Sequence, residues 1–551
     1  MSLKLPAVVI ALGLAVPAFH SAAQPGAPAA GRSGMVSSAH PLATEAGLKI
    51  LRSGGNAFDA AVAVAAALNV VEPEMSGMGG YGTILVYDAK SKKTWFLNPS
   101  GRIPAAVDSD AFRAPTPGYV ENRRGAKSVS TPGNVHAWEA MSRRHGRLKW
   151  SRLFEPAIDL AANGFALESR EADLIARGFA GFPEHARTIY GPHGKPLGAG
   201  ERLVQTDLAR SLGLVAKGGA AAFYEGELAG AIDGAMKEAG GFLSLADLAR
   251  DEAEWRAPIA IRYRGVDVLT ASPPANAFDY LVRLGLMQQF DVRALGHNSV
   301  EYLHRFAEAT KHGFWVRLRY AGDPDVAPPP LDRLLSAAYW KEQAAAIDAA
   351  KAKPFVPPGV SGGADRHTTH FVVADKDGNI VSATLTLGGV FGSRIMPRGT
   401  GIWLNDSLEF STFEPKGNPM DAHAGRRKLS GDCPTIILRN GRPWAALGTP
   451  GGHTIGQTVP QIVMNLVDFG MDVQEALAAP RVSFAEPDVL MVEEAIPVAV
   501  RTALASRGHN LRVTRGMGNA HALTIEFGPD GRIAGFKGAA DPRGAGRAAG
   551  F

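Results

Sequence analysis

Two threonines and a histidine stand directly before a predicted strand in the stretch DRHTTHFVVADKDGNIVSATLTLGG, residues 365–389. Threonine favours strands, so the pattern also fits an ordinary hairpin. A chain cut between His367 and Thr368 would instead expose an N-terminal threonine. Its α-amino group, with an unperturbed pKa of about 7.7–8.0, can accept the proton of its own hydroxyl. We therefore predict cleavage at this bond and a nucleophilic Thr368.

The turn DKDGN determines which residue faces this threonine across the hairpin. If Asp377 and Gly378 centre the turn, pairing places Thr386 opposite Thr369, or opposite Thr368 when a longer loop or a bulge adds one residue. A second hydroxyl at that distance would orient the nucleophile and its amine. We predict that Thr386 orients Thr368.

A second motif, GTPGGHTIG, offers consecutive backbone amides at Gly451 and Gly452 before a predicted helix. Such amides can hold the oxyanion that develops when a carbonyl is attacked. The same residues also fit an ordinary Pro-Gly-Gly turn. The stretch is not a phosphate loop, because no lysine follows in the required place.

Other chemistries lack their motifs. His370 and His453 do not have the spacing of paired metal ligands, and we expect them to be structural or to line a pocket. The glycines of SGMGGYG do not match a dinucleotide fingerprint. We predict neither a metal nor another cofactor.

Composition argues against a nucleic-acid partner and excludes an internal disulfide. The 551 residues carry a net charge of +5, from 58 basic and 53 acidic side chains spread along the chain. Nucleic-acid binding requires clustered basic residues, so we expect no nucleic-acid partner. Cys433 is the single cysteine and cannot form an internal disulfide.

The N-terminus has the pattern of a secretory signal peptide. A lysine precedes an apolar run over residues 5–19, and small residues follow up to Ala23. We predict a signal peptide over residues 1–23 and a periplasmic or secreted protein without a membrane contact after signal cleavage. The alternative is an uncleaved membrane anchor.

The remaining chain divides by its predicted elements. Asn56 and Asp59 form a capping pattern before an Ala/Val/Leu-rich helix that runs to Val71. Residues 133–352 show apolar side chains at three- and four-residue spacing, which predicts a mainly helical region. Residues after 367 alternate strand patterns with Asp-Gly and Asn-Gly turns.

Taken together, these motifs resemble the γ-glutamyltransferase (glutathione hydrolase) family of N-terminal nucleophile hydrolases. The resemblance rests on SGGNAFDAAVA, EPEMSGMGGYG, TTHFVVADKDGN, TPGGHTI, APR and DPRGAGRAAGF, in that order across the chain. It implies an α/β fold of four αββα layers that cleaves itself into a large subunit, residues 24–367, and a small subunit, residues 368–551. The two would remain together as a heterodimer.

The resemblance also implies roles for individual residues. It makes Thr368 the nucleophile, Thr386 its orienting partner and the amides of Gly451 and Gly452 the oxyanion donors. Ser430 matches the first of two serines that hold the substrate's α-carboxylate.

Several positions depart from the family pattern. Ser109 stands where the family has a carboxylate-binding arginine, and Gly388 and Gly431 replace an asparagine and the second serine. Arg102 is either a substitute for that arginine or an ordinary surface residue. Glu409 is placed to meet a cationic α-amino group.

The resemblance implies an amidohydrolase or acyltransferase that acts on γ-glutamyl amides such as glutathione through an acyl-threonine. The segment between Phe410 and Arg426 is short, which predicts an open cleft and hydrolysis in preference to transfer. One alternative is an acylase-like enzyme for a non-glutamyl dicarboxylic monoamide or another acyl amide, favoured by the departures above. Another is an inactive binding paralogue, which intact Thr368 and Thr386 disfavour.

Overall fold

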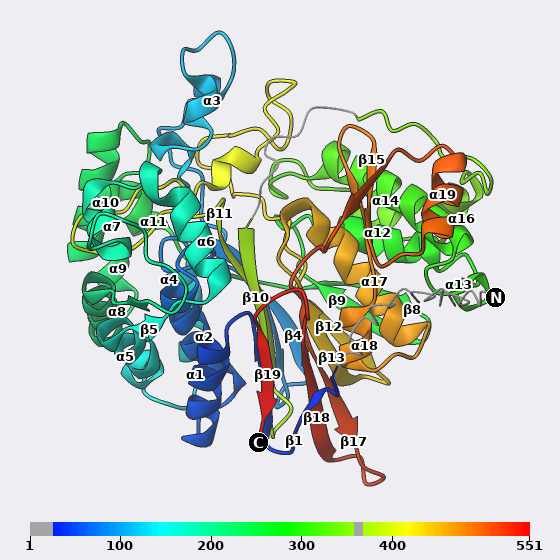
Figure 1. Ribbon diagram of the computed structural model, residues 1–551, viewed down its shortest axis with the longest axis horizontal. Helices are drawn as coiled ribbons and strands as arrows, with labels where there is room; N and C mark the ends of the chain where they lie inside the picture. The colour runs from blue at the N-terminus through cyan, green and yellow to red at the C-terminus, as the bar shows by residue number, and fades with distance from the viewer. Residues whose placement is uncertain (1–25, 358–366) are drawn as a thin grey trace, which may run out of the picture.

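The computed structural model describes residues 26–357 and 367–551. The predicted signal peptide lies outside the described residues. Two seven-stranded sheets face each other, and helices cover the outer face of each (Figure 1). The four layers therefore follow the order helix, sheet, sheet, helix, which confirms the expected αββα architecture.

The first sheet contains the strand that leads to the glycine motif. Its strand order is β1 (Ala29–Gly31), β18 (Ile533–Ala540), β17 (His521–Phe527), β13 (Arg442–Gly448), β12 (Thr435–Arg439), β9 (Val266–Thr270) and β8 (Ile259–Tyr263).

The second sheet contains both threonines of the predicted catalytic pair. Its strand order is β19 (Arg547–Gly550), β2 (Gly34–Ser38), β10 (His367–Asp375), β11 (Ile380–Gly388), β3 (Tyr81–Asp88), β4 (Lys93–Asn98) and β7 (Glu254–Arg256). A small separate sheet contains β14 (Val482–Ala485), β15 (Val489–Glu493) and β16 (Leu511–Thr514).

Three apolar cores hold the layers together. The core between the sheets includes Leu85, Val372, Ile436 and Leu523, which come from four different strands. The other two lie between each sheet and its helices. Helices on the second sheet include α1 (Pro41–Arg52), α2 (Ala57–Val71), α4 (Asn134–His145), α5 (Glu155–Asn163), α6 (Ser169–Gly178), α8 (Thr206–Gly218) and α10 (Glu227–Ala239). Helices on the first include α12 (Phe278–Met287), α14 (Val300–Tyr320), α16 (Ala337–Ala345), α17 (Ile455–Val467), α18 (Val473–Ala478) and α19 (Val498–Ser506).

Helix α2 begins and ends where the sequence predicts. The Asn56 side chain accepts hydrogen bonds from the amides of Phe58 and Asp59, and the Asp59 carboxylate accepts one from the Asn56 amide. This reciprocal cap satisfies amides that a helix start leaves without partners. Every residue from Ala57 to Val71 is buried, as the small apolar side chains require.

Residues 133–352 are mainly helical, as predicted, but they also contain strands. The region expected to be mainly helical also forms β7, β8 and β9. In β9, residues of Val266–Thr270 alternate between buried and half-buried positions, which is the two-residue period of a strand. The segments with this two-residue period are short and lie between longer helical patterns, which is why the sequence predicts helix for the region as a whole.

Strands from both predicted subunits share the second sheet. Strand β10 pairs with β2 on one side and with β11 on the other, and β11 pairs in turn with β3. In the described part of the chain, none of the helices is both long enough and apolar enough to cross a lipid bilayer.

Candidate active site

The hairpin of β10 and β11 places Thr368 directly opposite Thr386. This is the register predicted for a loop that is one residue longer, and it is uniform from Ala374 to Thr368. A separate irregularity follows between Thr368 and His367. The turn is held by the Asp375 carboxylate, which accepts hydrogen bonds from the amides of Asp377 at 3.0 Å and Asn379 at 3.1 Å. It also accepts one from the amide of Ala57 at 2.9 Å, which ties the turn to the start of α2.

Four groups form one hydrogen-bonded chain around the predicted cleavage site. The hydroxyl of Thr368 donates to Thr386 Oγ1 at 3.3 Å, and the hydroxyl of Thr386 donates to the His367 carbonyl oxygen at 2.7 Å. The amide of Gly388 donates to Thr386 Oγ1 at 2.8 Å. A hydroxyl has one proton and two lone pairs, so Thr386 uses its full capacity and is held in one orientation.

The glycine motif lies at the start of α17. Gly451 has a φ of +132° and Gly452 one of +58°, both in the region that favours glycine. Gly452 lines the same cavity as Thr368, while Gly451 precedes it at the start of the short 3₁₀ turn Gly452–Thr454. Among the described residues, neither backbone N–H has a hydrogen-bond acceptor. These amides are therefore available to a ligand oxygen.

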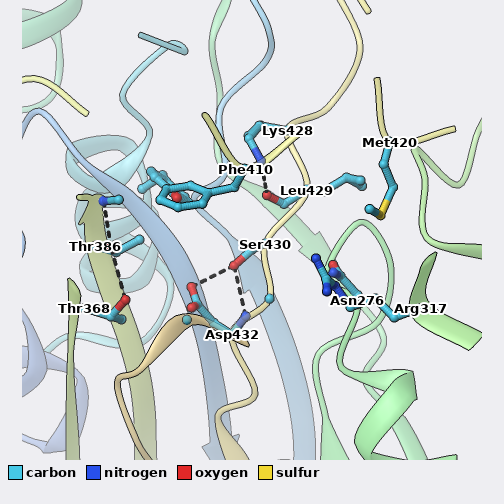
Figure 2. A pocket seen from close by; sticks show the side chains of 14 residues that line it. Asn276, Arg317, Thr368, Thr386, Phe410, Met420, Lys428, Leu429, Ser430 and Asp432 are labelled. Carbon is cyan, nitrogen blue, oxygen red and sulfur yellow. Dashed lines mark hydrogen bonds between the residues drawn. The ribbon is translucent and has the colours of Figure 1, made fainter. Parts of the chain in front are cut away.

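Thr368 faces a small cavity with both charged and apolar walls (Figure 2). The cavity encloses about 30 Å³, room for one or two water molecules, so a larger ligand must displace flexible side chains. It is lined by Tyr81, Asn276, Arg317, Thr368, Thr386, Gly388, Phe410, Met420, Lys428, Leu429, Ser430, Gly431, Asp432 and Gly452.

Ser430 and Gly431 line this cavity, as the family resemblance implies for a carboxylate site. The Ser430 hydroxyl, however, donates to Asp432 Oδ2 at 2.7 Å and accepts from Thr83 Oγ1 at 3.1 Å. Its single proton is committed to a carboxylate of the protein. In this arrangement Ser430 offers no proton to a substrate carboxylate.

Arg102 and Ser109 do not lie among the residues that line the cavity. The Arg102 side chain is 47% exposed and donates to the Gly425 carbonyl at 3.2 Å and to Glu254 at 3.5 Å. Ser109 Oγ accepts a hydrogen bond from Arg113 at 3.0 Å. Of the two alternatives for Arg102, the structure therefore favours an ordinary surface arginine.

Glu409 lies in a neighbouring pocket with His367 and Asp406. Its carboxylate pairs with Arg124 at 2.6 Å. Burial, followed by the charge of Glu409, raises the pKa of Asp406 well above its usual range. The structure thus separates Glu409 from the cavity that Thr368 faces.

The segment from Phe410 to Arg426 folds inward rather than leaving an open cleft. Phe410 and Met420 line the cavity, and the Arg113 guanidinium contacts both oxygens of Asp421 at 2.7 Å. The Arg113 side chain is only 7% exposed. This buried ion pair holds the short segment against the cavity, an effect that segment length alone does not reveal.

Sequence reasoning missed five polar residues of the cavity: Tyr81, Asn276, Arg317, Lys428 and Asp432. Lys428 was visible in KLSGDCP, two residues before Ser430, but a basic residue in GRRKLS is typical of a solvated loop. Arg317 lies inside an amphipathic helical pattern with no motif around it. In the structure Lys428 and Arg317 are both buried.

A group of buried carboxylates lies behind the nucleophile strand. Oxygens of Glu72, Glu74 and Glu171 lie within 4.8 Å of one another, close enough to share a metal ion. Thr369 donates to Glu72 Oε2 at 2.7 Å, and Arg170 lies 3.7 Å from Glu72 Oε1. Burial raises the pKa of Glu72 to about 7. A proton on Glu72 would therefore reduce the negative charge of the three carboxylates, as a metal ion would.

His370 and Cys433 are both buried. His370 shares a hydrogen bond of 2.8 Å with Thr384 through Nδ1, and burial lowers its pKa well below the usual value. Burial raises the pKa of the Cys433 thiol well above its usual range, which keeps it in the unreactive protonated form.

Comparisons with known proteins agree with this geometry. The chain is 34% identical to the glutathione hydrolase proenzyme of Escherichia coli (strain K12), over 98% of this chain and 94% of the relative. It is 38% identical to the acylase ACY 1 proenzyme of Pseudomonas sp. (strain SE83), over 92% of both chains. The crystal structure of cephalosporin acylase from Bacillus halodurans superposes with a TM-score of 0.87 at 28% identity, covering 98% of this chain and 99% of that one. The profile of the gamma-glutamyltranspeptidase family matches residues 43–551, so the chain belongs to the gamma-glutamyltranspeptidase family of enzymes.

Proposed function

We propose that this protein is a self-processing amidohydrolase in which Thr368 cleaves its own chain and then forms an acyl-enzyme with γ-glutamyl-type amides. The observation that carries the proposal is the hydrogen-bonded chain from Thr368 through Thr386 to the His367 carbonyl. It joins the nucleophile, its orienting partner and the bond to be cut.

In self-processing, Thr368 Oγ1 attacks the carbonyl carbon of His367. The Thr386 hydroxyl stabilises the negative charge that develops on the His367 oxygen. The C–N bond then breaks, the hydroxyl proton passes to the leaving nitrogen, and an ester joins His367 to Thr368. Water hydrolyses this ester, which leaves a carboxylate on His367 and a free α-amine on Thr368.

In turnover, the free amine of Thr368 takes the proton of its own hydroxyl while Oγ1 attacks the substrate carbonyl. The amides of Gly451 and Gly452 hold the oxyanion, and the proton passes to the departing amine. Water, or an acceptor amine, then attacks the acyl-threonine. The chemistry needs no cofactor.

The shared sheet supports a stable pair of subunits after cleavage. Strands β10 and β11 of the small subunit, residues 368–551, lie between β2 and β3 of the large subunit, residues 24–367. Their separation would expose the cores on both faces of this sheet. We infer a permanent heterodimer, exported through the signal peptide over residues 1–23.

The substrate has two candidates, and the names of the relatives include both. A glutathione hydrolase would accept the γ-glutamyl group, with its α-amino and α-carboxylate groups. An acylase-like enzyme would accept a dicarboxylic monoamide that lacks the α-amino group. The second candidate is favoured by the position of Glu409, which pairs with Arg124 outside the cavity.

The first test uses the wild-type protein and Thr368→Ala. On a denaturing gel the wild type should give two chains and hydrolyse an acyl anilide, whereas the alanine variant should give one chain and no turnover. Cleavage or turnover that persists without Thr368 would exclude this mechanism.

The second test compares kcat/KM for γ-glutamyl anilide and glutaryl anilide, which differ by the α-amino group alone. A site built for the α-amino group should reject glutaryl anilide strongly, because the polar groups of the site that bind this amine would be left unpaired. A large ratio makes the protein a γ-glutamyl hydrolase. A ratio near or below one assigns it to the acylase-like candidate.

Water and amines compete for the acyl-threonine. We propose that hydrolysis exceeds transfer, because the cavity that Thr368 faces encloses only about 30 Å³, which admits water more readily than an acceptor amine. Product analysis in the presence of a dipeptide acceptor tests this, and a majority of transfer product would overturn it.

A further inference from the structure

Arg317 lies on α14 and lines the same cavity as Thr368, although 51 residues separate them in the sequence. Figure 2 shows the two threonines on one side of the pocket, Asn276 and Arg317 on the other, and Ser430 and Asp432 between them. We propose that Arg317 binds a carboxylate at the distal end of the acyl group. This inference rests on the proposed function and specifies its substrate class.

The Arg317 guanidinium has unused hydrogen-bonding capacity at a buried position. Its Nη1 has no hydrogen-bond partner, although the residue is 5% exposed. Unpaired buried polar groups are costly, and those found in a binding cavity point to a ligand. A planar guanidinium also matches the geometry of a carboxylate, which it can bind through two N–H groups.

Neighbouring side chains orient this guanidinium, and the charges of Asp279 and Glu486 act on it without an ion pair to either within 4.0 Å. In the amide orientation that satisfies both of its contacts, Asn276 accepts a hydrogen bond from Arg317 Nε at 3.0 Å. The nearby carboxylate of Asp279 makes its ion pair with Arg283 at 2.9 Å. Among the described residues, Arg317 has no ion pair within 4.0 Å with a carboxylate.

The candidates for carboxylate binding that the family resemblance implies are absent from the cavity or already engaged. Arg102 and Ser109 do not line it, and the proton of Ser430 is committed to Asp432. The Asp432 carboxylate would repel an acyl carboxylate placed beside Ser430. Arg317 lies on the opposite side of Ser430 from Thr368. An acyl carboxylate placed at Arg317 therefore gains a charge-assisted hydrogen bond and avoids this repulsion.

The charges of the cavity favour the same class of substrate. Its described lining includes two basic side chains, Arg317 and Lys428, and one acidic side chain, Asp432. A net positive cavity attracts acyl groups that carry a negative charge. The expected substrates are amides of dicarboxylic acids whose second carboxylate reaches Arg317, with or without an α-amino group near Asp432.

The test uses four anilides and the processed wild-type enzyme. Glutaryl and γ-glutamyl anilides carry the distal carboxylate, whereas butyryl and 4-aminobutyryl anilides lack it. We expect kcat/KM to be about 10-fold to 150-fold higher for the carboxylate-bearing member of each pair, the usual effect of a charge-assisted hydrogen bond. In Arg317→Met this preference should disappear, while kcat/KM for butyryl anilide stays within about threefold.

Arg319→Met is the matched control, because Arg319 lies on the same helix and is exposed. It should retain the preference. An equal loss for all four anilides in Arg317→Met would mean that Arg317 is only structural, and an unchanged preference would also overturn the inference. A processed wild type that hydrolyses none of the four would instead refute the proposed function.

A second measurement avoids the variant, in case Arg317→Met fails to fold. Glutaramate and butyramide differ by the distal carboxylate, and both are tested as competitive inhibitors of the wild type. Glutaramate should inhibit at least tenfold more tightly, and the difference should shrink as salt is added. Equal inhibition by the two would overturn the inference.

Discussion

The hydroxyl of Thr386 donates a hydrogen bond of 2.7 Å to the carbonyl oxygen of His367, the residue that precedes the nucleophile. Because this oxygen becomes negatively charged when Thr368 attacks, Thr386→Val should slow self-cleavage by about 10²- to 10³-fold, the usual effect of losing one oxyanion donor. A time course of chain cleavage on denaturing gels measures the rate. Thr386→Ser retains the hydroxyl and should remain within about tenfold of the wild type; equal rates for all three proteins would contradict this role.

A side chain at position 388 should disturb the site. Gly388 has a φ of +104°, and a Cβ there would lie 2.0 Å from Asp406 Oδ1. Gly388→Ala, and equally the asparagine that the family carries, should therefore lower stability by more than the backbone strain of about 1–3 kcal/mol and impair cleavage. Thermal unfolding and the gel assay measure both effects.

The matched control for this prediction is Gly399→Ala. Gly399 also has a positive φ, +70°, but a Cβ there would meet nothing within 4 Å. The difference between the two variants measures the clash with Asp406 and Phe410, whose ring carbon Cε2 would lie 2.8 Å from the added Cβ. Equal destabilisation by the two substitutions would show that the clash is relieved.

The carboxyl of Glu72 should make folding stability depend on pH. Burial raises its pKa from 4.5 to about 7, so between these values the folded chain keeps a proton that the unfolded chain releases. Stability should therefore fall as pH rises from about 4.5 to 7, by up to about 3 kcal/mol from this group. Urea unfolding of the uncut Thr368→Ala protein at several pH values measures the slope.

In that background Glu72→Gln should flatten the slope, although Glu74 retains part of it because burial and then Glu72 raise its pKa well above the usual value. Glu45→Gln serves as a control, since the Glu45 side chain is 52% exposed. A slope that is unchanged in Glu72→Gln would disprove the assignment.

The motifs APR and DPRGAGR meet in a buried ion network. Arg481 pairs with Asp541 at 2.8 Å, and Arg543 pairs with Glu493 at 2.6 Å and with Asp541 at 2.9 Å. Arg481→Met should lower stability by about 3–5 kcal/mol, because it removes one partner of a buried pair. Denaturant unfolding measures the loss, and Arg532→Met, at a side chain that is 89% exposed, should have almost no effect.

This network also predicts a loss of stability in acid. Burial alone would raise the pKa of Asp541, but the charges of Arg481 and Arg543 lower it below the usual 3.8. The contribution of Asp541 is therefore complete above about pH 4 and is lost as pH falls through its lower folded-state pKa. Asp541→Asn should lose this acid dependence, and an unchanged acid transition would contradict the prediction.

The pairing of Thr368 with Thr386 could be predicted from local sequence because a hairpin is a local structure. The spacing of Thr368, the DKDGN turn and Thr386 limits the register to two choices, and the side-chain hydrogen bonds of Asp375 close the turn. The capped helix from Ala57 to Val71 could be predicted for the same reason. The short strands β7 to β9 could not, because β7 pairs with the distant β4, and the β8–β9 hairpin joins its sheet only through the distant β12.

The sequence by itself determined the family and predicted the nucleophile, its partner and the glycine motif, since each depends on residues close together in the chain or on motifs in a set order. Only the tertiary structure decided which charged groups face Thr368. Arg102 and Ser109 lie outside the cavity, and Arg317 enters it from α14. The reason is physical: the packing of α14 against α12 and β14 sets the position of this guanidinium, and no spacing along the chain encodes that distance.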